Sequence, residues 1–215
     1  MKISILLPYK ENFSPEYAGA VSIFVNETSM CSKYKKSITI FGNTNFKKKL
    51  QKNYINLPLK KEIFQSGSKV YVNEFLKFEK NSPSDIIEIH NRPNYFHLVH
   101  KSKPSLKIVL YFHNDPLTMT GSRSVADRKN LLENATKIIF NSHWSRKRFL
   151  EGINILHINS EKMNVIYQST SLKKVNLDSK EKWITFVGKL NKAKGYDLFG
   201  KAVIKILKKI QKLES

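Results

Sequence analysis

The chain has 215 residues, enough for one large domain or for one domain and part of another. Hydrophobic residues make up 40%, so a sizeable core can form, and only 8 glycines and 7 prolines exclude a collagen-like or linker-type chain. A single cysteine excludes a disulfide framework and a cysteine-based zinc cluster. The 38 Lys and Arg residues against 17 Asp and Glu give a formal charge of +21, which excludes an acidic solvating protein and points to anionic partners.

Lysine accounts for most of this charge, since only five of the cations are arginine and 33 are lysine. Asn and Ile are abundant as well, as in proteins from AT-rich genomes, and lysines scattered over a solvated surface are the plainer interpretation. A nucleic-acid-binding module is the alternative, and it would need basic residues clustered on one face with aromatic residues between them. No such stripe stands out, so we expect no specific nucleic-acid partner.

Short apolar runs alternate with helical patterns along the chain. Strands are predicted at 3–7, 37–41, 85–89, 107–112, 137–140, 164–167 and 183–187, and helices at 18–32, 94–101, 124–135, 143–152 and 196–213. Residues 44–84 are less regular, and 70–78 fits a helix or a strand. Buried strands that alternate with helices predict βαβ units, and therefore a Rossmann-like three-layer α/β fold with a parallel sheet.

A polar, lysine-rich segment without periodicity, 173–182, predicts a linker between a domain over 1–172 and a new unit over 183–215. In that unit a strand, a turn and a helix follow one another, as at the start of a second Rossmann-like domain. The helix carries an apolar face within residues 198–213 that one βα unit cannot bury alone. We expect the exposed face to drive self-association.

The first apolar run, 3–7, is too short for the core of a signal peptide and ends at Pro8, and no stretch approaches the roughly 20 apolar residues of a membrane span. These features predict a cytoplasmic protein, with peripheral contact to the anionic inner face of the membrane favoured by its charge.

Ligands of open α/β sheets bind beyond the carboxyl ends of the strands, where several polar segments occur in this sequence. Gly19 stands at a helix start, where it either admits an anion to the backbone N–H groups or merely eases a turn. Asn91 and Arg92 follow a strand and suit a polyhydroxyl or phosphate group, or else bond to a loop. His113 ends the next strand near Asp115, as a proton or hydrogen-bond donor or as a structural residue.

A last candidate site lies at the turn before the final helix. There Gly188 gives close approach, and Lys189 and Lys194 with the helix N-terminus at Gly195 could hold a diphosphate without metal. His97 and His100 lie three apart without a third ligand. Because Walker, GxGxxG and Asp-x-Asp motifs are also absent from the sequence, we expect neither a metal site nor a cofactor.

In this order, the motifs resemble those of the retaining glycosyltransferases of family 4, which have the GT-B fold. The resemblance runs from Met1 to about Leu213 and rests on five stretches: IIEIHNRPN at 86–94, IVLYFHND at 108–115, ATKIIFNSHWSRKRF at 135–149, NVIYQSTS at 164–171 and ITFVGKLNKAKGYDLF at 184–199. The last is similar to the phosphate-binding opening of the family's C-terminal domain.

The resemblance implies metal-independent transfer of a sugar, with retention, from a nucleotide-sugar donor to a glycan or lipid-linked acceptor, as in lipopolysaccharide biosynthesis. By this likeness Lys189 and Lys194, with Gly188 and Gly195, hold the donor diphosphate, and Gly19 lies near the donor phosphate or the acceptor. His113 contacts the transferred sugar, while Asn91 and Arg92 face the acceptor. A related sugar-nucleotide epimerase is disfavoured by the motif at 188–195.

The sequence departs from the family pattern in three places. Ala18-Gly19-Ala20 stands where a Gly-Gly pair is common, and Gln168-Ser169-Thr170 where Asn-Gly is typical. The glutamate-rich donor motif does not occur before Ser215. We therefore expect a truncated copy of such an enzyme, whose 215 residues alone are inactive.

Overall fold

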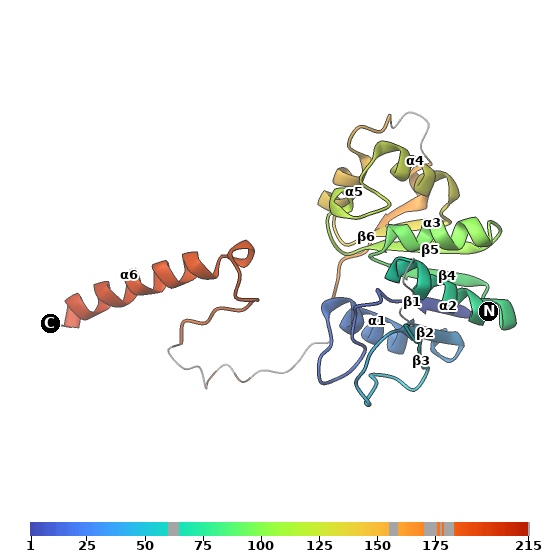
Figure 1. Ribbon diagram of the computed structural model, residues 1–215. Coiled ribbons are helices and arrows are strands. Elements are labelled where there is room, and N and C mark those ends of the chain that lie inside the picture. Colours follow the sequence, from blue (N-terminus) through green and yellow to red (C-terminus); the bar gives the residue numbers. More distant parts are fainter. Residues whose placement is uncertain (60–64, 155–158, 170–175, 177, 179–182, 215) are drawn as a thin grey trace. The chain divides into compact units, whose positions relative to one another are not determined.

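The computed structural model describes residues 1–59, 65–154, 159–169, 176, 178 and 183–214 (Figure 1). The chain divides into two compact units, Met1–Ser171 and Leu172–Ser215. In the described residues no helix is both long and apolar enough to cross a membrane.

The first unit is built on a seven-stranded sheet in which all neighbouring strands are parallel. The strand order is β3-β2-β1-β4-β5-β6-β7. The strands are β1 (Ile3–Leu6), β2 (Ile38–Gly42), β3 (Tyr54–Asn56), β4 (Ile86–His90), β5 (Lys107–Phe112), β6 (Lys137–Phe140) and β7 (Met163–Val165). The helices are α1 (Ala20–Cys31), α2 (Gly67–Asn81), α3 (Pro93–Ser102), α4 (Val125–Asn134) and α5 (His143–Leu150). Short 3₁₀ helices η1 (Lys35–Ser37), η2 (Pro116–Thr118) and η4 (Ser160–Lys162) complete the unit.

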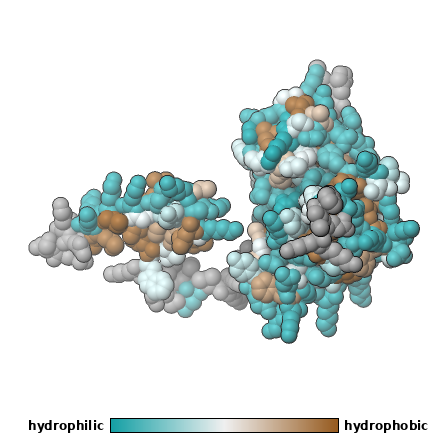
Figure 2. All heavy atoms as spheres, viewed as in Figure 1, coloured by the Kyte–Doolittle hydropathy of each residue, from teal (hydrophilic) through white to brown (hydrophobic). Residues whose placement is uncertain are grey.

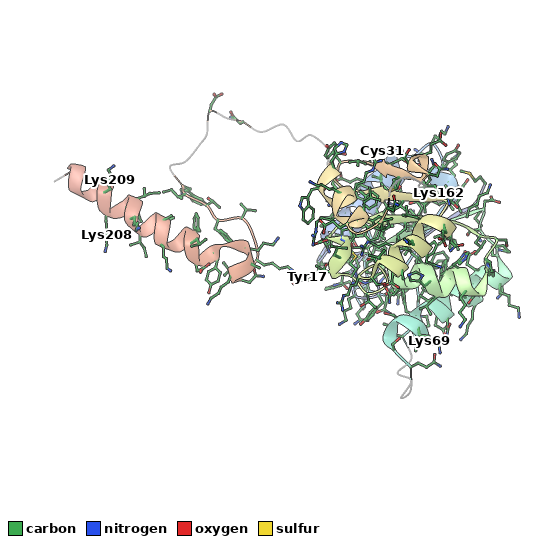
Figure 3. All side chains as sticks on the ribbon, turned by 90° about the horizontal axis from the view of Figure 1, so that it is seen from above. Tyr17, Cys31, Lys69, Lys162, Lys208 and Lys209 are labelled. Atoms are coloured by element: carbon green, nitrogen blue, oxygen red, sulfur yellow. The ribbon has the colours of Figure 1, made fainter. Side chains whose placement is uncertain are left out.

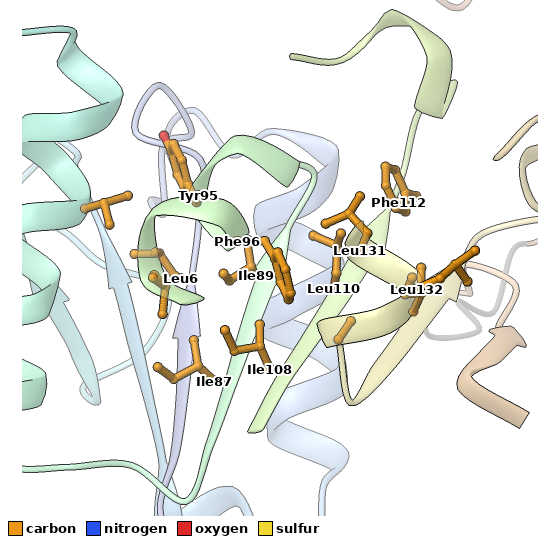
Figure 4. Packing of buried hydrophobic residues seen from close by; sticks show 14 of the residues in the cluster. Leu6, Ile87, Ile89, Tyr95, Phe96, Ile108, Leu110, Phe112, Leu131 and Leu132 are labelled. Atoms are coloured by element: carbon orange, nitrogen blue, oxygen red, sulfur yellow. The ribbon is translucent and has the colours of Figure 1, made fainter. Parts of the chain in front are cut away.

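Both faces of the central strands are covered, which explains why they are apolar runs and not alternating patterns. On one face Leu6 and Ile87 pack with Phe96 of α3 in the larger core cluster (Figure 4). On the other face Ile5 packs with Phe24 of α1 in a second cluster. The predicted Rossmann-like three-layer α/β fold is thus confirmed.

Local signals in the sequence fix where several helices begin. Ser124 and Asp127 form a reciprocal capping box at the start of α4. Ser142 accepts a hydrogen bond from the backbone N–H of Ser145 at the start of α5.

Two details of the first unit differ from the prediction. The ambiguous stretch 70–78 lies within α2, whose buried face carries Val70, Tyr71 and Phe75. The strand expected at 164–167 is β7, which begins and ends earlier: the backbone N–H of Ile166 makes a last hydrogen bond to the carbonyl of Phe140, and the side chains of Ile166 and Tyr167 are exposed.

In the second unit the structure describes η5 (Lys192–Lys194) and α6 (Tyr196–Glu214). The strand predicted at 183–187 is wrong: these residues are not a strand, and Trp183 and Val187 are 78% and 92% exposed. A strand is stabilised by hydrogen bonds to a neighbouring strand, and no described segment of this unit supplies one. Helix α6 forms as predicted, and its apolar residues gather along one side (Figure 2).

Candidate functional site

The connections of the sheet reverse direction between β1 and β4, its two central strands. From β1 the chain proceeds outward through β2 to β3, and it then returns to β4 and proceeds outward the other way to β7. Ligands of open α/β sheets bind at such a reversal, beyond the carboxyl ends of the strands. The residues that follow β1 and β4 therefore stand at the expected ligand-binding edge.

A pocket of about 280 Å³ lies at this edge. It is lined by residues after β1 and β4, at the start of α2 and α3, and after η2: Tyr9, Lys10, Ser68, Asn91, Arg92, Pro93, Asn94, Met119 and Thr120. The backbone N–H of Tyr9 donates to the hydroxyl of Tyr95 at 3.2 Å, which ties the loop after β1 to α3. Sequence analysis predicted Asn91 and Arg92 as ligand-binding residues and missed the rest of this lining.

Asn91 connects the pocket to the neighbouring strand. Its φ of 56° places it in the left-handed region, which asparagine tolerates better than most residues. Its side-chain Oδ1 accepts a hydrogen bond from the backbone N–H of His113 at 3.3 Å, and Arg92 Nη1 donates to its carbonyl at 2.7 Å. Non-glycine residues held in this region are concentrated at functional sites.

His113 is fixed at the end of β5 by asparagines from both neighbouring strands. Asn91 follows β4, and Asn141, which follows β6, donates from Nδ2 to the carbonyl of His113 at 2.8 Å. The ring packs edge-on against Phe24 of α1, with centroids 5.2 Å apart. The imidazole is thus rigidly placed at the carboxyl end of the sheet.

Both ring nitrogens of His113 have partners within the chain. Gln168 Nε2 donates to its Nδ1, so the ring proton lies on Nε2, which is 3.0 Å from Nδ1 of buried His90. His90 in turn carries its proton on Nε2, which lies 3.6 Å from a carboxylate oxygen of Glu88. Burial, and secondly the neighbouring His90, lower the pKa of His113 from 6.5 to about 3, so this imidazole is neutral at pH 7.

Asp115 and His97, which were considered in the sequence as further site residues, bond to other groups of the chain. Asp115 does not orient His113: its carboxylate pairs with Arg148 at 3.2 Å and accepts from the backbone N–H of Leu117. His97 Nε2 lies 2.8 Å from the carbonyl of Gly121. In the described part of the chain no group of three or more His, Cys, Asp or Glu residues could hold a metal ion.

Gly19 makes room for a carboxylate. It is the N-cap of α1, and a Cβ built on it would lie 2.1 Å from Oε1 of Glu11. The same oxygen accepts from the backbone N–H of Ser22 in the first turn, at 3.1 Å. The chain thus places its own anion at this helix N-terminus, where the helix dipole favours negative charge.

The second unit brings Gly188 close to Lys194. A Cβ at Gly188 would lie 3.7 Å from Cβ of Lys194 and 3.2 Å from the ring of Phe186. Asn191 caps η5 by accepting from the backbone N–H of Lys194, and Gly195, at φ 73°, leads into α6. Lys189 and Lys194 are both exposed. The loop therefore forms a compact turn that presents lysines before a helix N-terminus.

The structure brings together Asn91, Arg92 and His113 of the predicted site residues. Gly19 stands at the start of α1, and Gly188, Lys189, Lys194 and Gly195 belong to the second unit. Sequence reasoning did not assign His90, Asn141 or Gln168 to the surroundings of His113. Their positions were the available signal. His90 ends β4 and Asn141 follows β6, the two strands beside β5, and Gln168 comes after the last strand, β7.

No protein-family model matches the chain, and no curated protein matches it in sequence. Solved structures resemble it in fold, among them the following three. HepE of Anabaena, solved with UDP and glucose, has a TM-score of 0.52 and 15% identity over 79% of this chain and 45% of its own. Sucrose-phosphate synthase of Thermosynechococcus elongatus has a TM-score of 0.53 and 10% identity, over 78% of this chain and 48% of its own. UDP-N-acetylglucosamine 2-epimerase of Rickettsia bellii has a TM-score of 0.50 and 9% identity, over 77% of this chain and 44% of its own. The chain spans less than half the length of these three proteins, and it shares with them the α/β architecture of GT-B enzymes.

Proposed function

We propose that this chain belongs to a glycosyltransferase that transfers a sugar from a nucleotide-sugar donor to a surface-glycan or lipopolysaccharide-type acceptor. The observation that carries the proposal is the junction at Asn91: one residue lines the pocket at the reversal of the sheet and also holds the backbone of His113. The ring of His113 does not line the pocket but packs against Phe24 of α1, so the side chain of Asn91 is the link between the two. The fold supports this class, since HepE was solved with UDP and glucose.

In this proposal the donor diphosphate binds to Lys189 and Lys194 before α6, without metal, and the transfer retains the configuration of the sugar. Fixed positive groups stabilise the charge that develops on a departing diphosphate. The compact turn at Gly188 and the N-terminus of α6 favour an anion there. The epimerase shares the fold, so the sequence of this turn is what favours transfer over epimerisation.

His113 would orient the transferred sugar by a hydrogen bond. Its ring is neutral and its Nε2 proton is engaged by His90, so the nitrogen available to a hydroxyl is Nδ1. Gln168, which occupies Nδ1, is exposed and must move aside when the sugar binds. In an active glycosyltransferase that contains this chain, replacing His113 by Ala should lower turnover about 10²–10³-fold. Replacing His97, which bonds to the carbonyl of Gly121, should leave turnover near wild type.

The donor phosphate is proposed to lie near Gly19 as well, where Glu11 now places its carboxylate. A phosphate at that position must displace this negative charge. Glu11→Gln should therefore tighten the binding of a nucleotide sugar, because the repulsion between carboxylate and phosphate is removed. Unchanged or weaker affinity in Glu11→Gln would place the donor elsewhere.

The donor assignment can be tested by titrating the protein with UDP and UDP-glucose in a calorimeter. We expect the double variant Lys189→Gln, Lys194→Gln to lose most of the affinity. The matched control is Lys208→Gln, Lys209→Gln, which removes the same charge farther along α6 (Figure 3). Equal loss in both variants would reduce the effect to net charge and contradict the assignment.

Reaction class is tested by incubating the protein with labelled UDP-sugars and glycolipids extracted from bacterial envelopes. Label in the glycolipid together with free UDP supports the proposal. An epimerised nucleotide sugar with no labelled glycolipid would assign the chain to the epimerases instead.

A further inference from the structure

The pocket at the reversal of the sheet, called here the switch-point pocket and lined by the nine residues given above, contains two cations and no acidic residue. Lys10 is exposed and Arg92 is half-buried. Among the described residues neither side chain takes part in a salt bridge. The positive charge in this pocket is therefore not neutralised by the carboxylates that the structure describes.

Arg92 donates to a backbone carbonyl, as Arg123 and Arg128 do, and differs from the other four arginines in its place at the switch-point pocket. Arg148 pairs with Asp115 and Glu151, Arg128 donates to three backbone carbonyls, and Arg123 donates to the carbonyl of Thr118. Arg146 lies on α5. Arg92 alone lines the switch-point pocket, held there by its hydrogen bond to the carbonyl of Asn91. In a chain whose cations are mostly lysine, an arginine at a pocket indicates recognition of a planar or bidentate anion.

The neutral groups of the pocket suit the remainder of such a ligand. Ser68, Asn94 and Thr120 offer hydroxyl and amide groups, and Tyr9 offers an aromatic ring. Hydroxyl and amide side chains both donate and accept hydrogen bonds, as a sugar ring requires.

We propose that the switch-point pocket binds an acceptor sugar that carries an anionic substituent, a carboxylate or a phosphate, through Arg92 and Lys10. The inference rests on the proposed function, since it names the acceptor class of that site. The anion would pair with the two cations, and the sugar hydroxyls would bond to the neutral groups.

The test is a set of nuclear magnetic resonance titrations of the ¹⁵N-labelled protein with glucuronate, glucose 6-phosphate and glucose. We expect the two anionic sugars to shift the backbone amide resonances of Asn91, Arg92 and Asn94, and we expect glucose to bind about tenfold more weakly. A response to only one of them identifies the anion as carboxylate or phosphate. Equal shifts with glucose, or no shifts at residues 91–94 with either anionic sugar, would overturn the proposal.

Two variants assign the effect to the cations. Lys10→Gln changes an exposed side chain, so the fold should be kept. This variant should bind the anionic sugar about tenfold more weakly than the wild type. Arg92→Lys keeps the charge, loses the bidentate geometry, and should weaken binding by a smaller factor. Lys52→Gln, which removes a lysine from a different pocket, is the matched control and should change nothing. If Lys52→Gln weakens the probe as much as Lys10→Gln, overall charge is responsible and the proposal fails.

UDP is titrated into the same sample to separate this inference from the proposed function. Binding of UDP without binding of the anionic sugars refutes the anionic acceptor alone. Binding of the anionic sugars at residues 91–94 without UDP supports the pocket and contradicts the nucleotide-sugar function.

Discussion

The low pKa of His113 makes acid stability a direct test of the geometry around it. Burial and the adjacent His90 lower this pKa from 6.5 to about 3 in the folded protein. Below pH 6.5 the unfolded chain binds a proton on this ring and the folded chain does not, so the free energy of unfolding falls as the pH falls. The slope is about 1.4 kcal/mol per pH unit, and the loss continues to about pH 3, for a total of roughly 5 kcal/mol.

The perturbation is His113→Asn, which removes the titrating ring. Urea unfolding of both proteins between pH 7 and pH 4.5 should show the wild type losing stability more steeply than the variant, by about 1.4 kcal/mol per unit. In the wild type, the His113 ring resonances should stay unchanged over the same range, with the proton on Nε2. Parallel stability curves, or a ring that titrates near pH 6.5, would refute the reasoning.

A companion variant separates the two causes of the shift. His90→Gln keeps a hydrogen-bond acceptor for Nε2 of His113 but removes the neighbouring imidazole. Because burial is the larger cause, the pKa of His113 should rise and remain below its ordinary value. A return to the ordinary value in this variant would show that the pair interaction, and not burial, is dominant.

Three further predictions concern stability and association. Glu79→Ala should lower the free energy of unfolding by about 3 kcal/mol or more, measured by urea denaturation, because the buried carboxylate accepts hydrogen bonds from two serine hydroxyls and one backbone N–H; a loss below about 1 kcal/mol would contradict this. Gly121→Ala should cost clearly more than Gly195→Ala in thermal unfolding, because both have positive φ but only at Gly121 would the new Cβ meet backbone, 2.6 Å from a neighbouring amide nitrogen; equal costs would refute the steric argument. The protein should self-associate through the apolar face of α6, where Leu198 and Ile206 are exposed, and replacing both by Glu should give a monomer by light scattering; a monomeric wild type would disprove it.

The fold could be predicted from sequence because its strands are buried on both faces and therefore read as continuous apolar runs. Ile87 and Ile89 face the larger core, and β4 was located within one residue. The strand at 183–187 failed for the opposite reason: its sequence is equally apolar, but hydrogen bonding to a neighbour, which sequence does not display, decides whether a strand forms. The prediction over residues 44–84 was incomplete because the short strand β3 is only half-buried and shows little hydrophobic pattern.

The candidate site was predictable only in part. Position after a strand singled out Asn91, Arg92 and His113 correctly as neighbours, since the carboxyl ends of parallel strands meet at one edge. The partners of His113 were harder to predict: His90 ends the strand beside β5 but was not paired with His113, and Gln168 lies 55 residues away in sequence. Nor does sequence spacing reveal that Glu11 folds back onto Gly19.

The attachment of Asn91 to both the switch-point pocket and the backbone of His113 constrains how this protein can diverge. A substitution at Asn91 that reshapes the pocket also removes a hydrogen bond from the backbone of His113, so the shape of the pocket and the placement of the imidazole cannot be changed independently at this position. Changes to the pocket are instead open at residues that line it without bonding to His113, such as Lys10 after β1 and Ser68 at the start of α2. Diversification should therefore be concentrated at those two places, while the asparagine remains.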